Sequence, residues 1–110
     1  MAESLPEALL ERIADRFRVL GDETRLSILR LLLDEGELNV GEIVERLSAS
    51  QANVSKHLRI LHDAGVVSRR AHGTSAYYSV TDPTLTQICD LVCVRIREQV
   101  ANDARSVAIA

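Results

Sequence analysis

The fold follows from residues 48–64, which read SASQANVSKHLRILHDA. Ser48 or Ser50 can cap the N-terminus of a helix here, because a hydroxyl oxygen accepts from the unpaired amides of the first turn. Gly65 is suited to end the helix, since glycine adopts the left-handed conformation at little cost. Three apolar residues recur at helical spacing and form one stripe: Val54, Leu58 and Leu61. The stretch therefore predicts an amphipathic helix.

The arc opposite this stripe carries small, amide and cationic side chains, namely Gln51, Ala52, Asn53, Ser55, Lys56 and Arg59. Glutamine and asparagine can pair with adenine, while lysine and arginine pair with guanine or phosphate. A solvated face on a surface helix is the plain alternative for such an arc. The neighbouring segments have to decide between the two interpretations.

Those neighbours predict a helix-turn-helix with a wing. Residues 40–47 read as a short apolar-sided helix with Asn39 as its cap. Two short helices joined by a turn, the second with a polar outer face, are typical of a helix-turn-helix at about residues 39–64. Residues 66–80 then contain two β-rich runs around Gly73, which predict a β-hairpin.

The remaining chain predicts three further helices and one short strand. Apolar residues at helical spacing favour a first helix at about 6–20 and a last helix at about 82–102, with a loose tail from Asn102. A second helix is expected between Asp22 and Gly36, followed by a short strand at Glu37-Leu38 that pairs with the hairpin. The expected fold is mainly α with a small β-hairpin wing, a winged helix-turn-helix with five helices in the order α-α-(β)-α-α-β-β-α.

Length and charge agree with a nucleic-acid-binding domain. The 110 residues fit a single domain spanning 1–110. The net charge of −3 divides into −5 for residues 1–49, +3 for residues 50–79 and −1 for residues 80–110. A cationic patch on an acidic body is the electrostatic pattern expected of a DNA-binding protein.

Other classes of protein find no support in the sequence. There is no Ser/His/Asp order, Gly-rich phosphate loop or pair of carboxylates typical of an enzyme. No apolar run approaches the ~20 residues that cross a membrane. We expect a cytoplasmic protein without a membrane partner, whose two cysteines are thiols.

Several motifs of this chain resemble those of the ArsR/SmtB family of winged-helix transcriptional repressors and follow one another in the family's order. They are LGDETRLSIL at 20–29, SQANVSKHL at 50–58, LHDAGVV at 61–67, and the segment from Gly73 to Tyr78. The resemblance implies a homodimer, built by the first and last helices, that binds palindromic double-stranded operator DNA. The apolar stripes of these helices supply the expected interface: Leu9, Ile13, Phe17, Leu85, Ile88, Cys89, Val92 and Ile96.

The same comparison assigns the DNA contacts. Base edges or the nearby backbone are expected to meet Gln51, Ala52, Asn53 and Ser55, and phosphates to meet Ser50, Lys56 and Arg59. The wing is expected to dock through Arg69, Arg70, His72 and Ser75. A winged-helix module that binds a protein through this surface is the alternative, although clustered basic residues favour DNA.

The family releases DNA when a metal, a metalloid or thiol oxidation acts on it, and each route requires particular residues. A Cys-x-Cys site is absent, since Asn39 and Gly41 stand in its place. The family's site on the last helix needs imidazoles, and no histidine follows His72, so zinc, nickel or cobalt is not expected there.

Cys89 and Cys93 remain as candidate sensor thiols. They lie four residues apart and therefore on one helix face. Three roles stay open for them: packing as small apolar residues, redox or sulfur sensing, and binding of a thiophilic metal or metalloid. No cofactor is otherwise expected.

Overall fold

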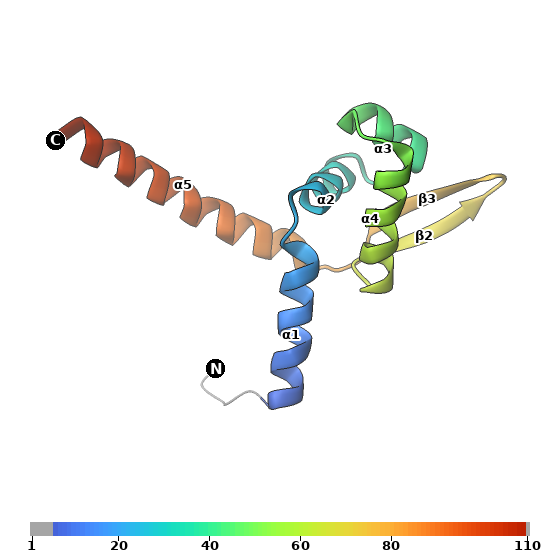
Figure 1. The fold of residues 1–110 in the computed structure, drawn as a ribbon, viewed down its shortest axis with the longest axis horizontal. Coiled ribbons are helices and arrows are strands. Elements are labelled where there is room, and N and C mark those ends of the chain that lie inside the picture. The colour runs from blue at the N-terminus through green and yellow to red at the C-terminus, as the bar shows by residue number, and fades with distance from the viewer. Residues whose placement is uncertain (1–5, 110) are drawn as a thin grey trace.

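A computed structural model describes residues 6–109; residues 1–5 and 110 of the predicted domain lie outside the described residues. The elements follow one another as α1 (Glu7–Leu20), α2 (Glu23–Glu35), β1 (Leu38–Asn39), α3 (Val40–Leu47), α4 (Gln51–Asp63), β2 (Val67–His72), β3 (Ser75–Val80) and α5 (Leu85–Ile109). This order, visible in Figure 1, confirms the predicted winged helix-turn-helix.

The wing is an antiparallel sheet with the strand order β1-β3-β2. The hairpin lies within the predicted range, and its pairing continues to His72 and Ser75, which leaves only a tight turn at Gly73 and Thr74. Gly73 has a φ of 62°, which a residue with a Cβ rarely adopts. The expected third strand is present, one residue later than predicted, where Leu38 lies opposite Tyr78.

Side-chain caps fix the helix starts, as the sequence indicated. The Asp22 carboxylate accepts from the Arg25 amide at 2.9 Å, and Asn39 forms a capping box with Glu42 through bonds of 2.8 and 2.9 Å. Of the two candidates for α4, Ser50 is the cap, accepting from the Asn53 amide at 3.1 Å. Each cap satisfies an amide that the helix itself leaves unpaired.

The core lies between α2, α3, α4 and the base of the wing. Its fully buried side chains are Ile28, Leu29, Leu32, Ile43, Val54, Leu58, Leu61, Val66 and Leu85. Burial of each leucine or isoleucine stabilises the fold by about 1.5–3 kcal/mol relative to exposure. The apolar stripe of α4 is thus turned inward, and its polar arc is left in solvent.

Helices α1 and α5 project from this core in different directions (Figure 1). The radius of gyration is 17.2 Å, whereas a compact chain of this length has about 13 Å. Two predictions about α5 are corrected. The helix begins at Leu85, after a turn at Pro83 and Thr84, and it continues to Ile109 in place of the loose tail expected from Asn102. No glycine or proline follows Pro83 to end it.

The capping box predicts a measurable stability difference. Asn39→Ala should lower the free energy of unfolding by about 1 kcal/mol, because the Glu42 amide in the first turn of α3 loses its side-chain partner. Asn53→Ala is the matched control, since the cap of α4 uses the Asn53 backbone and not its side chain. Urea unfolding without DNA compares the two; equal midpoints would contradict the stabilising role of the box.

Candidate nucleic-acid interface

The outer arc of α4 forms one continuous exposed surface. Val54, Leu58 and Leu61 are inaccessible to solvent, so the opposite side of the helix must face outward. A shallow hollow of about 460 Å³ runs along that side, lined by Ala52, Ser55, Lys56, Arg59 and Ile60. The structure therefore brings four of the predicted contact residues together, with two cations beside a mainly apolar floor.

A second hollow, of about 380 Å³, lies where the first turn of α4 meets the wing. Gln51 and Ser75, both predicted contact residues, line it together with Asn39, Val40, Gly41, Thr74 and Ala76. Thr74 and Gly41 were not among the predicted contact residues, since only the folded hairpin and the packing of α3 bring them beside α4. Ser50 uses an oxygen lone pair for its cap, which leaves its hydroxyl hydrogen free to donate.

The wing holds one of its two arginines in an ion pair. Arg70 donates to both carboxylate oxygens of Glu37, at 2.8 and 3.1 Å, and its guanidinium carbon lies 5.2 Å from the centre of the Tyr77 ring. His72 contacts the same ring edge-on. The Arg70 hydrogen bonds lower the pKa of Glu37, and Glu37 raises the pKa of Arg70. Glu37 thus neutralises one charge of the predicted cationic patch, while Arg69 remains exposed.

A further arginine connects α1 with α4. The Nε of Arg25 donates to the Val19 carbonyl at 2.6 Å, and its Nη1 lies 3.1 Å from Nδ1 of His57. His57 is only 8% exposed, and the contact itself is partly buried. The end of α1 and the middle of α4 are therefore joined through one guanidinium.

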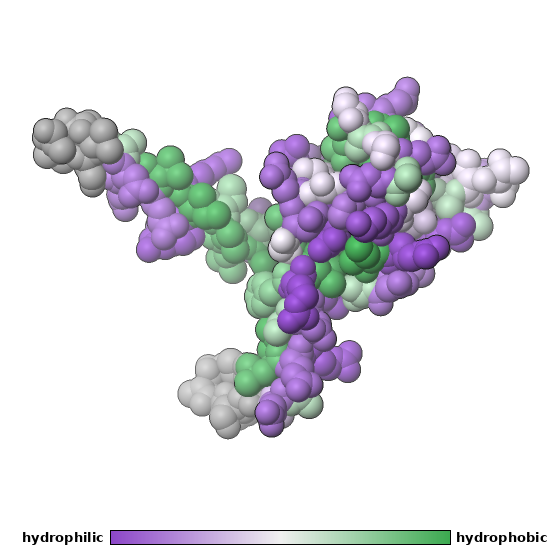
Figure 2. All heavy atoms as spheres, viewed as in Figure 1, coloured by the Kyte–Doolittle hydropathy of each residue, from purple (hydrophilic) through white to green (hydrophobic). Residues whose placement is uncertain are grey.

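The apolar faces of α1 and α5 stay largely uncovered. Leu9, Phe17, Val92 and Ile96 are exposed, whereas Ile13, Ile88 and Cys89 are half-buried. Figure 2 shows apolar side chains in a band along α5. Leu85 differs from the prediction: it is 1% exposed within the core of its own chain, and we leave it out of the candidate interface.

Both thiols border one apolar hollow of about 360 Å³ between α1, α2 and α5. Its lining is Phe17, Leu20, Gly21, Leu26, Ile88, Cys89, Val92 and Cys93. Burial, with a smaller effect of Asp90, raises the pKa of the Cys89 thiol. Cys93 is exposed. The predicted pair therefore combines a half-buried thiol and an accessible one on a single helix face.

Within residues 6–109, no three His, Cys, Asp or Glu side chains of one chain come close enough to hold a metal ion together. In the same part of the chain, no helix has the length and hydropathy that a bilayer crossing demands.

Comparison with known proteins gives a consistent result. The sequence profile described as "Bacterial regulatory protein, arsR family" matches residues 22–69. An uncharacterized HTH-type transcriptional regulator of Methanocaldococcus jannaschii is 40% identical over 82 residues, which cover 74% of this chain and 92% of that protein. An arsenical resistance operon repressor of Bacillus subtilis is 31% identical, with coverage of 78% and 84%.

A solved structure supports the same fold. It is the solution structure of a homodimeric winged helix-turn-helix DNA-binding domain from Mycobacterium bovis, with a TM-score of 0.74 and 31% identity. The match covers 89% of this chain and 92% of that one.

The Glu37–Arg70 ion pair generates a prediction for DNA binding. Glu37→Gln should free Arg70 to meet a phosphate, so affinity for any duplex should rise about threefold at ~50 mM salt, and the salt dependence should steepen by about one unit of slope. Fluorescence anisotropy across a salt series measures both. Glu11→Gln removes the same charge from α1 and serves as the control. An unchanged slope would mean that Arg70 does not reach the backbone.

Proposed function

The chain belongs to the arsR family of bacterial regulatory proteins and is a DNA-binding transcriptional repressor, and we propose that it acts as a homodimer on a palindromic operator. It is not an enzyme. The surface that carries this proposal is the exposed arc of α4 beside the wing, where amide, hydroxyl and cationic side chains gather. A regulator of DNA in a bacterium or archaeon would act in the cytoplasm.

The contact roles follow from side-chain chemistry. Lys56 and Arg59 line the hollow along α4, where they can meet phosphates and set the register of the helix. Gln51, Asn53 and Ser55 offer hydrogen bonds to base edges, and the Ala52 methyl offers an apolar contact to thymine. Ser50 would donate to the backbone, and the wing would contribute Arg69, His72 and Ser75, with Arg70 available once Glu37 releases it.

The dimer is supported by the uncovered faces of α1 and α5. Phe17, Val92 and Ile96 lie exposed on the projecting parts of α1 and α5, and pairing with a second copy would remove this apolar surface from water. Two copies would place two α4 helices about one DNA turn, ~34 Å, apart. A two-fold symmetric protein then requires a palindromic site.

A titration tests this function. The wild-type protein should bind a duplex recovered by selection from random sequence with nanomolar affinity and two chains per site. Gln51→Ala should relax the preference at one base pair by about 1–3 kcal/mol, because a bidentate contact to a base is lost. Lys56→Ala should weaken binding to all sequences alike and reduce the salt slope by about one.

Arg95→Ala, an exposed cation on α5, is the control for Lys56. Only weak, sequence-blind binding by the wild-type protein would contradict the proposal and favour a protein-binding module instead.

The inducer is proposed to act on Cys89 and Cys93. Two thiols on one apolar hollow beside the proposed interface can change their surroundings when they bind a thiophilic metal or metalloid or become oxidised. A relative, the Bacillus subtilis protein, is named as an arsenical resistance operon repressor. Two thiolates are too few for a closed metal site, and a symmetric pair of chains would bring four.

The thiol proposal predicts inducer-dependent release. Arsenite, cadmium, peroxide and persulfide are each added to the reduced protein on its operator, and at least one should raise the apparent Kd by about tenfold, in the range typical of allosteric coupling. The Cys89→Ser/Cys93→Ser double variant should bind the operator normally and ignore that reagent. Equal release of both proteins would assign the thiols to packing alone.

A further inference from the structure

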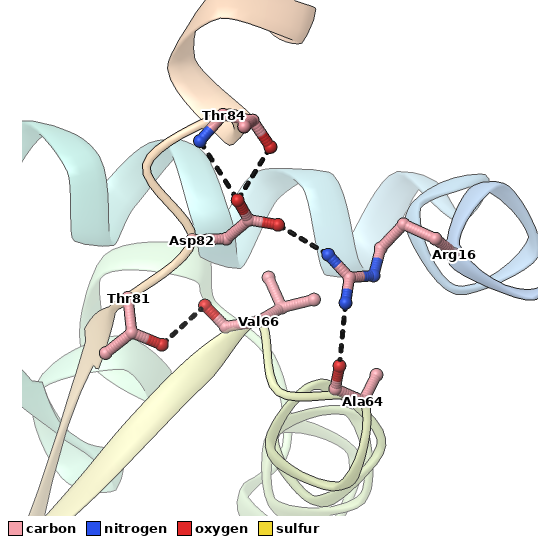
Figure 3. A network of polar contacts seen from close by, with 6 residues as sticks. All are labelled: Arg16, Ala64, Val66, Thr81, Asp82 and Thr84. Atoms are coloured by element: carbon pink, nitrogen blue, oxygen red, sulfur yellow. Dashed lines mark hydrogen bonds and ion pairs between the residues drawn. The ribbon is translucent and has the colours of Figure 1, made fainter. Parts of the chain in front are cut away.

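Arg16 joins three elements at the junction shown in Figure 3. Its Nη1 donates to the Asp82 carboxylate at 2.5 Å, and its Nη2 donates to the Ala64 carbonyl at 3.1 Å. Arg16 belongs to α1, Ala64 is the C-cap of α4, and Asp82 precedes α5. One guanidinium therefore bridges both projecting helices and the end of the helix proposed to read DNA.

The partners on either side are themselves held in place. Asp82 accepts from the amide and the hydroxyl of Thr84, at 2.9 and 2.6 Å, through the oxygen that Arg16 does not use. These bonds from Thr84, with a further contribution from Arg16, lower the pKa of Asp82 and keep it ionised. At the other end, the last carbonyls of a helix carry partial negative charge, which favours a cation.

The fork geometry is specific to arginine. A planar guanidinium presents parallel N–H groups in fixed directions, whereas an ammonium group is a compact charge on a flexible chain. The Arg16 side chain is 39% exposed and Asp82 is 14% exposed, so the pair lies at a partly solvated surface. Ion pairs in such places contribute little to stability, and the main effect of this one is to fix an angle.

We infer that Arg16 is a positioning residue for operator binding, which sets the direction of α4 relative to the helices that carry the second copy. The inference rests on the proposed dimeric function. The contact sits at the C-terminal end of α4, while the predicted base contacts lie at its N-terminal end. Since α4 has 13 residues, the lever is about 20 Å long.

Over this length, a small rotation of α4 shifts its N-terminal end out of register with the DNA base pairs. A tilt of about 10° at Ala64 moves the far end of α4 by roughly 3 Å, close to the ~3.4 Å rise of one base pair. In a dimer both copies tilt, so the distance between the two recognition helices changes while each helix keeps its own contact surface. Arg16 should therefore affect the spacing between half-sites and not the recognition of a half-site.

The test compares three duplexes: the palindrome selected by the wild-type protein, the same palindrome with one base pair inserted at its centre, and an isolated half-site. For the wild-type protein the insertion should cost at least tenfold in affinity. Arg16→Gln should bind the native palindrome about tenfold more weakly and the half-site unchanged, so that its discrimination between the two spacings nearly disappears.

Two further variants separate positioning from charge. Arg16→Lys should behave like Arg16→Gln, because lysine keeps the charge but cannot hold Asp82 and Ala64 in one fixed plane. Arg18→Gln is the matched control, since it removes the same charge from the same helix at a side chain that is 72% exposed and paired with Asp15 within α1. It should retain wild-type spacing discrimination.

Sedimentation and urea unfolding establish that each variant is a folded dimer; if Arg16→Gln is not, Asp82→Asn replaces it in the same assay. Wild-type discrimination in the folded variants would overturn the inference, as would an equal loss on palindrome and half-site. A wild-type protein with no sequence preference would instead overturn the proposed function, and the inference with it.

Discussion

The apolar stripe of α4 packs between α2, α3 and the base of the wing, and the rest of the molecule depends on that contact. Val54, Leu58 and Leu61 are inaccessible to solvent there. Because side chains surround a helix at fixed angles, burial of one stripe determines which residues face the solvent. The outer residues are those that suit phosphates and bases. Rotation of α4 by even a quarter turn would move Lys56 or Arg59 into the core. The free-energy cost of burying an unpaired charge strongly opposes such a rotation.

The two projecting helices, unlike α4, leave much of their apolar surface exposed to water. A single chain leaves Leu9, Leu10, Phe17, Val92 and Ile96 exposed to water, because α1 and α5 extend away from the core (Figure 1). The isolated chain therefore has a complete helix-turn-helix core and an incomplete remainder. A second copy would supply the missing contacts, which is why the proposed function places two chains on one operator.

Three arginines connect units of the fold that are distant in sequence. Arg70 joins the wing to Glu37, Arg25 joins the end of α1 to His57, and Arg16 joins α1 to the ends of α4 and of the loop before α5. The ion pairs of Arg70 and Arg16 lie partly in solvent, where such pairs add little free energy. Their common consequence is geometric: they fix how the wing and the projecting helices are oriented around the core.

The local structure was determined by the sequence itself. Periodic apolar residues identified the helices, while Asp22 and Asn39 identified two of their starts, and Ser48 or Ser50 a third, because a cap and its amide lie within three residues of each other. The exposed arc of α4 could also be predicted from the sequence, because it is the side opposite the apolar stripe. The apolar pattern was less informative at the end of α5. It weakens there, yet the helix continues because no glycine or proline interrupts it.

Only the tertiary structure decided the contacts between elements. Leu85 followed the stripe of α5 in the sequence, yet it lies in the core because the chain turns at Pro83 and Thr84. Glu37 is 33 residues from Arg70, and Arg16 is 66 residues from Asp82. At such separations the sequence does not indicate which charged side chains will pair, since any surface arginine can meet any carboxylate. Which pairs form depends on how the core, the sheet and the two projecting helices pack.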